Sequence, residues 1–215
     1  MKTPFTQEQF FGIFEEYNTG TFPFQITLLI LGILGVFLIH SKIKNKNSMI
    51  GGLLGILWLW SGIVYHMAFF TAINKAAYGF GGIFILQGLF FLVETYRGKL
   101  EFSWSKSTWQ FAGYFFIVFG LIIYPIISFL LAKSSLHIIS LGLPCPTTIF
   151  TFGWLMLTSK RLSKYLLIIP TLWAVIGAMA AINFGIYQDY VMLLAALVAN
   201  IYLIKRKKEP SEREK

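Results

Sequence analysis

The only cysteine of the chain, Cys145, lies between two prolines in the stretch GLPCPTTIFTFGWLM at residues 142–156. A thiol can serve as a nucleophile, as a metal ligand or as a thiolate at a helix N-terminus. Because the first residue of a helix does not need the N–H group that proline lacks, Pro146 is predicted to begin a helix. We therefore expect Cys145 at the N-cap. There, the free N–H groups of Thr147 and Thr148 and the helix dipole would favour a thiolate or bind an anion.

His66 and Asp189 are two other ionisable residues whose predicted depth matches that of Cys145. At about 1.5 Å per helical residue, Cys145 and Asp189 lie roughly 21–22 Å above the cytosolic ends of their segments, and His66 lies about 25 Å above its own. An imidazole at this depth is costly unless it faces protein or water. The three side chains can therefore share one layer of the outer leaflet and bind a small solute or an ion there. The predicted binding residues are Cys145, His66, Asp189, Thr147, Thr148, Tyr65, Asn183 and Glu16.

Cys145, His66 and Asp189 can also be read as ligands of a soft or borderline metal ion, the only cofactor that the sequence suggests. They come from three different helices, however, and no local ligand spacing supports this hypothesis. Structural roles are a further alternative. In these, the prolines stabilise a helix break around a small buried thiol, His66 bonds a carbonyl or Tyr65, and Asp189 caps the last helix.

The composition requires most of the protein surface to face lipid. Hydrophobic residues make up 56% of the 215 residues and charged residues only 13%, whereas soluble domains carry about 25% charged residues. Uncharged runs approach or exceed the roughly 20 residues that cross a hydrocarbon core of about 30 Å. The predicted spans are 22–41, 49–73, 76–96, 108–132, a compound segment 136–159, 164–184 and 187–204. We therefore predict an all-α polytopic membrane protein with seven transmembrane helices.

The compound segment is predicted to be broken at the Pro144-Cys145-Pro146 elbow. Between Pro146 and Lys160 there are only 13 residues, about 20 Å of helix, which cannot cross the bilayer. Residues 136–143 would then enter from outside, and a half-helix would descend from the elbow. Irregular backbone at this depth needs a cover of protein or of a wet cavity.

Lysine and arginine alternate between the two sides of the predicted topology. The odd-numbered connections and the C-terminal flank hold thirteen of them: Lys42, Lys44, Lys46, Arg97, Lys99, Lys106, Lys160, Arg161, Lys164, Lys205, Arg206, Lys207 and Lys208. The opposite side holds Lys2, Lys75 and Lys133. By the positive-inside rule, the N-terminus is outside and the C-terminus is in the cytosol. The net charge of +9 then reflects topology and contact with anionic lipid headgroups, which argues against nucleic acid as a partner.

The segment before the first span predicts a short helix on the outer membrane surface, at about residues 6–17. Thr6 and Gln9 fit a capping box, and phenylalanines fall on one face of this helix. The helix is either an anchor or a lid whose Glu15, Glu16 and Asn18 cover an entrance. We expect one membrane domain at 1–204 and a charged, disordered tail at 205–215.

Four pieces of the sequence are distinctive: PFTQEQFFGIFEEYN; WLWSGIVYHMAFFTAINKAAYGF, followed by LQG; GLPCPTTIFTFG; and IPTLWAVIGAMAA with GIYQDY. Together they cover almost the whole chain, and they resemble a family of small bacterial multi-pass membrane proteins known only as a domain of unknown function. The resemblance implies a bacterial cytoplasmic (inner) membrane protein and a set of candidate positions. It brings no established activity.

Three classes of function are compatible with these features. The broken helix, the polar layer and the near absence of extramembrane mass favour a small transporter or channel for a small solute or ion. The alternative is an intramembrane enzyme, in which Cys145 is the nucleophile and His66 is a base within hydrogen-bonding reach. A seven-helix sensor is disfavoured because no output domain is present. Glycine-rich faces such as Gly32/Gly35 and Gly51/Gly55 can serve internal packing or a homo-oligomer.

Overall fold

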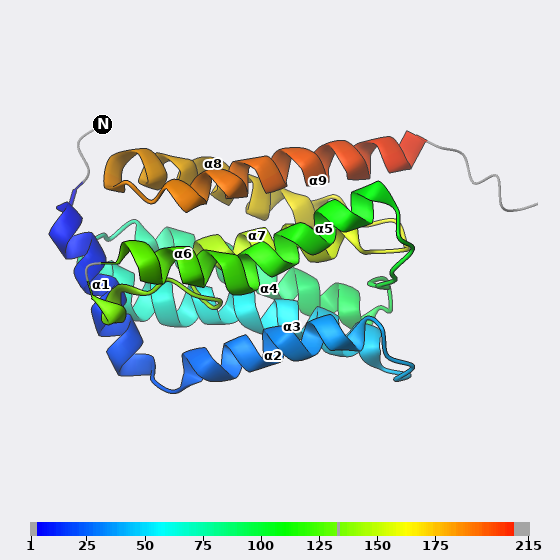
Figure 1. Cartoon of the computed structure of the whole chain (residues 1–215), viewed down its shortest axis with the longest axis horizontal. Coiled ribbons are helices and arrows are strands. Elements are labelled where there is room, and N and C mark those ends of the chain that lie inside the picture. Colours follow the sequence, from blue (N-terminus) through cyan, green and yellow to red (C-terminus); the bar gives the residue numbers. More distant parts are fainter. Residues whose placement is uncertain (1–3, 133, 209–215) are drawn as a thin grey trace, which may run out of the picture.

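The chain folds into a bundle of helices, as the computed structural model shows for residues 4–132 and 134–208 (Figure 1). The α-helices are α1 (Gln7–Thr21), α2 (Phe24–Leu38), α3 (Lys46–Trp60), α4 (Ala77–Tyr96), α5 (Thr108–Val118), α6 (Tyr124–Leu131), α7 (Pro144–Met156), α8 (Tyr165–Phe184) and α9 (Tyr190–Lys208). Two π-helical segments, η1 (Ser61–Phe69) and η3 (Phe119–Ile123), continue α3 and α5. Short 3₁₀ turns are η2 (Phe70–Ala72), η4 (Ser135–His137) and η5 (Tyr187–Asp189). The predicted all-α class is confirmed.

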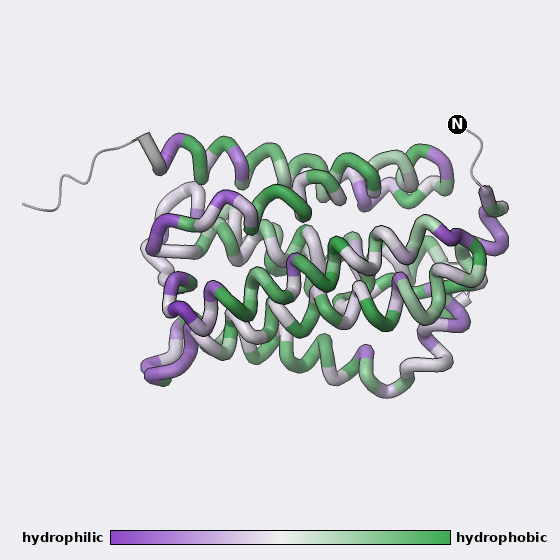
Figure 2. The backbone as a smooth tube through the Cα atoms, turned by 180° about the vertical axis from the view of Figure 1, so that it is seen from behind, coloured by the Kyte–Doolittle hydropathy of each residue, from purple (hydrophilic) through white to green (hydrophobic). Residues whose placement is uncertain are grey.

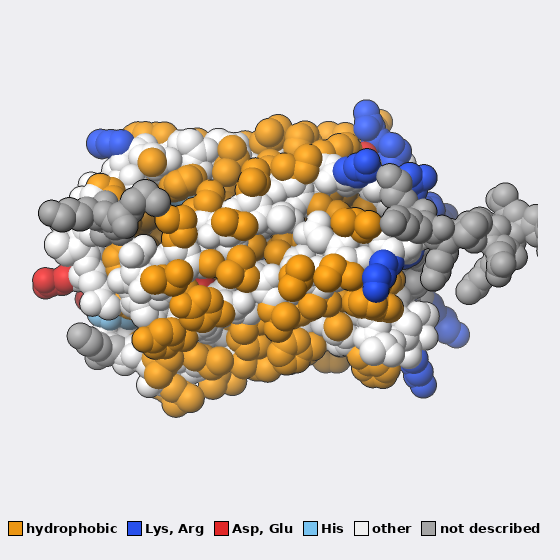
Figure 3. Space-filling view, turned by 90° about the horizontal axis from the view of Figure 1, so that it is seen from above, with side chains coloured by type: hydrophobic (Ala, Val, Ile, Leu, Met, Phe, Trp, Pro, Cys, Tyr) orange, Lys and Arg blue, Asp and Glu red, His pale blue; other side chains and the backbone are white. Residues whose placement is uncertain are grey.

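Five helical runs of the described residues are long and apolar enough to cross a membrane. They are Lys46–Ala72, Ala77–Tyr96, Thr108–Leu131, Tyr165–Phe184 and Tyr187–Arg206. Helices α1 and α2 meet at 85° and give a sixth span if the bent pair is counted as one. The middle of the bundle is apolar along the backbone trace and on its surface (Figures 2 and 3). These features identify a membrane-associated protein.

Glycines let neighbouring helices approach until their backbones touch. A Cβ atom on Gly88 of α4 would lie 3.0 Å from the Gly55 carbonyl oxygen of α3, and one on Gly153 of α7 would lie 2.5 Å from the Gly113 carbonyl oxygen of α5. A Cβ atom on Gly51 would instead meet the Thr95 side chain of α4. The Gly51/Gly55 face therefore serves packing inside the molecule, the first of the two roles expected for it.

Prolines inside the helices leave backbone carbonyls that other groups satisfy. Pro170 in α8 has no N–H to offer the Leu166 carbonyl, four residues earlier. The Gln87 side chain of α4, which is fully buried, donates to this oxygen at 3.1 Å. Pro125 is the second residue after η3, and the wider π-helical turn before it gives its ring room beside the preceding turn.

The segment before α7 is irregular, and side chains from other elements satisfy its backbone. Asn18 of α1 donates to the Ile138 carbonyl at 2.9 Å, and Ser128 accepts from the Ile139 N–H at 2.8 Å. Ser61 donates to the Gly142 carbonyl at 2.7 Å. Buried irregular backbone is therefore tolerated here because protein groups cover it.

Helix α7 begins two residues earlier than predicted. Its N-cap is Leu143 and its first residue is Pro144, so Cys145 is the second helical residue. The Thr147 N–H donates to the Leu143 carbonyl at 3.2 Å and does not point at the sulfur. The prediction of Cys145 at the N-cap is therefore wrong, because Pro144, and not Pro146, occupies the position where a missing N–H costs nothing.

The bounds of the first and last helices, α1 and α9, differ from the predicted ones. The capping box of α1 is confirmed, since the Gln9 N–H donates to Thr6 Oγ1 and the Thr6 N–H to Gln9 Oε1. The helix continues to Thr21, four residues beyond the predicted end. At the other end, α9 extends to Lys208, so residues 205–208 of the expected disordered tail are helical. The rest of that tail, 209–215, lies outside the described residues.

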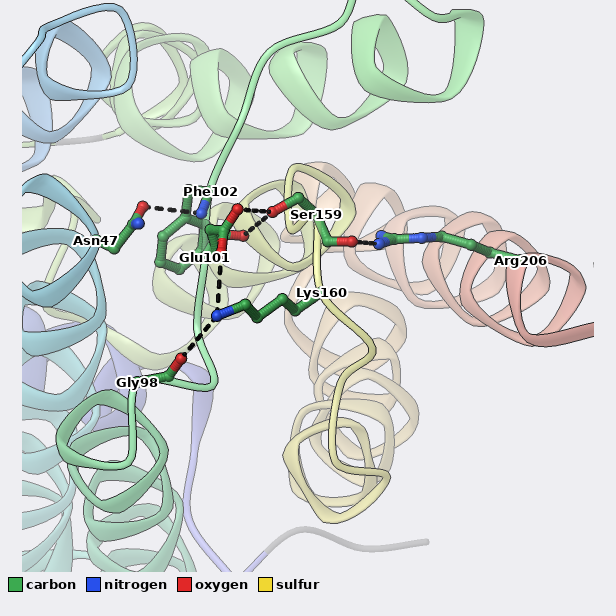
Figure 4. Close-up of polar contacts among 7 residues, drawn as sticks. All are labelled: Asn47, Gly98, Glu101, Phe102, Ser159, Lys160 and Arg206. Carbon is green, nitrogen blue, oxygen red and sulfur yellow. Dashed lines mark hydrogen bonds and ion pairs between the residues drawn. The ribbon is translucent and has the colours of Figure 1, made fainter. Parts of the chain in front are cut away.

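The two connections 97–107 and 157–164 are tied together at one end of the bundle (Figure 4). Lys160 pairs with Glu101 at 3.1 Å, and Ser159 Oγ donates to the same carboxylate at 2.9 Å. The bonds from Lys160 and Ser159 lower the pKa of Glu101. Arg206 of α9 donates to the carbonyl oxygens of Thr158 and Ser159. This network ties the connection before α8 to the connection 97–107 and to the end of α9.

Candidate functional site

A cavity of about 320 Å³ lies inside the bundle at the end that α1 crosses. Elements α1, η1, α6, α7, α8 and η5 all contribute to its wall. Its lining residues are Pro4, Phe5, Phe10, Phe14, Tyr65, His66, Phe70, Asn74, Phe80, Tyr124, Ile139, Leu143, Pro144, Cys145, Trp173, Ile176, Gly177, Met179, Asn183, Phe184, Ile186 and Asp189. The wall is thus mostly apolar and aromatic, with a few polar groups among the rings.

His66 is the polar group of this wall whose hydrogen bonds are missing. The residue is fully buried, and neither Nδ1 nor Nε2 has a hydrogen-bond partner among the described residues. Aromatic rings surround it, with the Phe84 centroid at 4.7 Å and the Trp173 centroid at 5.2 Å. The indole N–H of Trp173, on the same wall, interacts with the Cys145 thiol. His66 therefore lines the cavity as an unsatisfied buried polar side chain, and such a group in a native structure calls for an explanation such as a functional role.

Asp189 and Cys145 form a second polar group on the wall. The Tyr124 hydroxyl donates to Asp189 Oδ1, and the Cys145 thiol interacts with the same carboxyl group. Asp189 is 1% exposed, and Tyr124 is fully buried. The carboxyl group thus faces the cavity and not the N–H groups of α9, which argues against the helix-capping role considered for it.

The π-helical segments bring Tyr65, His66 and Tyr124 to the cavity. η1 contains Tyr65 and His66, and η3 ends one residue before Tyr124. A π-helical turn holds more residues than an α-helical turn, so it shifts the face that the following side chains occupy. Such segments occur frequently at functional sites. Their position on two of the helices around this cavity strengthens its assignment as the site.

Aromatic residues near the N-terminus cover the cavity. Phe10 of α1 stacks on Phe184 with centroids 4.4 Å apart, and Phe5 stacks on the same ring at 5.6 Å. Glu16, which was predicted to contribute to a lid, is exposed and does not line the cavity. The opposite, apolar face of α1 covers the cavity. Burying a carboxylate costs solvation free energy, whereas burying an apolar ring does not.

Five of the eight predicted binding residues line this cavity: Tyr65, His66, Cys145, Asn183 and Asp189. Asn183 is exposed, and its side chain donates to the Met179 carbonyl of the same helix at 2.7 Å. Thr147 and Thr148 do not line it. The Thr147 hydroxyl accepts from the Gly142 N–H at 3.1 Å, and the Thr148 hydroxyl donates to the Pro144 carbonyl at 2.8 Å. Both threonines therefore support the backbone around Cys145.

Two chemical hypotheses lose their geometric basis. Among the described residues, no three His, Cys, Asp or Glu side chains lie where they could hold one metal ion. The possible metal set of Cys145, His66 and Asp189 therefore gains no support from the geometry of the described residues. The nucleophile–base pair of Cys145 with His66 is also not formed, since neither ring nitrogen has a hydrogen-bond partner in the described part of the chain and the thiol interacts with Asp189 instead.

Tyr124 and Trp173 are site residues that the sequence analysis missed. Each carries a polar group in the middle of an apolar run, and a buried Tyr or Trp usually needs a partner for its O–H or N–H. Each also lies close to a helix-interior proline, Pro125 or Pro170. That combination of a polar aromatic residue and a nearby proline is a signal that could have identified them.

Comparison with known proteins agrees with the resemblance noted in the sequence. Residues 7–214 match a family described as "Family of unknown function (DUF6064)". No curated protein and no solved structure matches the chain. The function therefore has to be argued from the cavity itself.

Proposed function

We propose that this chain, which belongs to the DUF6064 family of unknown function, binds a small solute in the cavity beneath α1 and transports it across a membrane. The observation that carries the proposal is His66, a fully buried side chain on the cavity wall whose two ring nitrogens have no partner among the described residues. An unpaired imidazole inside a membrane protein is costly. A solute that bonds to it would recover this cost on binding.

The wall favours an uncharged solute with an apolar body and one or two hydrogen-bonding groups. Small-molecule sites typically occupy about 300–1,000 Å³ and combine apolar walls with a few placed polar groups. The cavity, at about 320 Å³, fits the lower end of that range. A hard metal cation such as Ca²⁺ or Mg²⁺ would need several oxygen ligands around it, whereas the wall consists mainly of aromatic and aliphatic side chains.

The topology that accompanies this function has seven spans in a bacterial cytoplasmic membrane, with the N-terminus outside. In addition to the five long runs, α2 and the compound segment that ends in α7 would cross the bilayer. The space-filling view supports this orientation, because most visible Lys and Arg side chains gather at the end of the bundle where α9 finishes (Figure 3). The cavity then lies in the outer leaflet, and α1 lies on the outer surface.

Helix α1 would act as the outer gate of the transporter. Phe5, Phe10 and Phe14 line the cavity from the N-terminal side, so a solute from outside would enter when this cover moves. The stacked contacts of Phe10 with Phe184 hold the cover closed.

Transport is tested with proteoliposomes that contain the wild type or the His66→Phe variant. Both are loaded with a mixed extract of small metabolites and diluted, and the retained solutes are identified by mass spectrometry over time. We expect at least one uncharged solute to leave wild-type vesicles faster than variant and empty vesicles. Identical profiles in all three preparations would contradict the transport proposal. A solute that is chemically converted would instead support an enzyme.

A further inference from the structure

A second hollow, of about 920 Å³, lies between α8 and α9. It is lined by Lys160, Arg161, Leu162, Lys164, Leu167, Ile168, Thr171, Leu172, Asn200, Leu203, Ile204 and Arg206. It shares no lining residue with the cavity beneath α1. Three of its basic residues come from the connection before α8 and Arg206 comes from the end of α9, whereas most of its apolar residues come from the two helices. The hollow is therefore basic at its mouth and apolar beyond it.

Two cations at the mouth are available for an anion. Lys160 already pairs with Glu101, and Arg206 already donates to the Ser159 carbonyl, as Figure 4 shows. Arg161 and Lys164 are both exposed, and no ion pair involves either among the described residues. No acidic residue lines the hollow. The mouth therefore carries an excess of positive charge that nothing on its wall neutralises.

The apolar part of the hollow continues along the surface of both helices. Ile168 and Leu172 of α8 are each 55% exposed, and Ile204 of α9 is 56% exposed. Val175 of α8 and Leu197 of α9 extend these rows towards the other end of the bundle, with 57% and 59% exposure. Figure 3 looks onto this face, where apolar side chains extend from the basic end along the molecule. Such a strip fits an acyl chain.

We infer that the hollow between α8 and α9 is a binding site for an anionic phospholipid. The phosphate group lies between Arg161 and Lys164, and an acyl chain follows the apolar rows of α8 and α9 into the bilayer. Charge complementarity selects the lipid class, because basic pockets at the cytosolic ends of transmembrane helices attract anionic headgroups. A bound lipid would hold α8 and α9 together at the end opposite the cavity.

The inference is tested on the full chain in a neutral detergent. Dioleoyl phosphatidylglycerol, dioleoyl phosphatidylcholine and inorganic phosphate are added separately, and thermal unfolding and native mass spectrometry are recorded. The test variant is Arg161→Gln/Lys164→Gln. The matched control is Lys42→Gln/Lys44→Gln, which removes the same charge from another connection at the same end and touches no lining residue.

Phosphatidylglycerol is expected to raise the unfolding temperature of the wild type and of the control, and to remain bound in the gas phase. The test variant should bind it about thirtyfold more weakly, the effect of removing two charges at an anionic headgroup. Equal binding of phosphatidylcholine, equal stabilisation by inorganic phosphate, or equal loss in the control variant would each overturn the inference. A wild-type dimer that dissociates in the test variant would assign the hollow to a second copy of the chain instead.

Discussion

His66 shows how a single residue can reveal a site through a missing interaction. Its depth was predicted from the sequence, together with the alternative that a carbonyl or Tyr65 would satisfy it. Both ring nitrogens instead lack partners in the described part of the chain, and Tyr65 contributes only a ring contact at 5.1 Å. The sequence could predict the depth because that depends on chain length. It could not predict the missing bond, because hydrogen-bond partners depend on the packing of several helices.

The His66→Leu variant is therefore expected to be more stable than the wild type. Replacing a buried, unsatisfied polar group by an apolar one removes a penalty of about 1–3 kcal/mol. Thermal unfolding in detergent should show a higher midpoint for the variant, while any transport through the cavity is lost. His137→Leu is the matched control, because His137 pairs with Glu15 at 3.4 Å and should gain nothing. A loss of folded protein in His66→Leu would mean that the imidazole is structural.

Cys145 is expected to react with a small, membrane-impermeant thiol reagent added from outside. Because Cys145 is the only cysteine, labelling reports this position alone. The basis is access through the cavity, since the N-cap argument for a reactive thiolate does not hold. The Phe10→Ala variant should label faster, because it removes a ring from the cover. Thr148→Val should label at the wild-type rate, because the Thr148 hydroxyl donates to the Pro144 carbonyl and does not line the cavity. Complete protection in both wild type and Phe10→Ala would show that the cavity does not open outwards.

The predicted bounds of an element match the structure well where a long apolar run sets them. They match poorly where the pattern of backbone hydrogen bonds sets them. Span 76–96 was predicted almost to the residue, as α4 shows. The π-helical character of η1 and the start of α7 at Pro144 were not predicted. Hydrophobic runs report burial in lipid, whereas these two features depend on which carbonyl each N–H selects. That choice follows from tertiary packing, such as the Ser61 bond to the Gly142 carbonyl.

At the scale of the helix, Gln87 is expected to stabilise α8 across the bundle. Pro170 has no N–H for the Leu166 carbonyl, so Gln87→Leu leaves this buried oxygen without any donor. The loss should lower the free energy of unfolding by about 1–3 kcal/mol. The test is a double-mutant cycle with Pro170→Ala, which restores an N–H at position 170. Thermal or denaturant unfolding should show a smaller cost of Gln87→Leu in the Pro170→Ala background. An equal cost in both backgrounds would show that Gln87 contributes through packing alone.

The two ends of the molecule carry different groups of side chains. Aromatic rings and the cavity lie at the end that α1 crosses, whereas most Lys and Arg side chains and the Glu101–Lys160 network lie at the other. The alternation of Lys and Arg along the sequence predicted this division, because each connection returns to one end of the bundle. His66, Cys145 and Asp189 line one cavity, but the sequence predicted only that they lie at a similar depth in the membrane. Their positions around the bundle axis required the packing of the helices.

Reporter fusions test the seven-span topology of the whole chain. Fusions after Lys46, Lys106 and Lys164 are expected to read cytosolic, and fusions after Asn74 and Ser134 to read outside. The pair Ser134 and Lys164 is decisive, because only the segment that ends in α7 lies between them. If α7 and the irregular backbone before it cross the bilayer together, the two fusions report opposite sides. If α7 does not complete a crossing, they report the same side, and the cavity then cannot connect an outer gate with a cytosolic exit by this path. A periplasmic signal after Lys46, Lys106 or Lys164 would contradict the seven-span topology and, with it, the assignment of α1 to the outer surface.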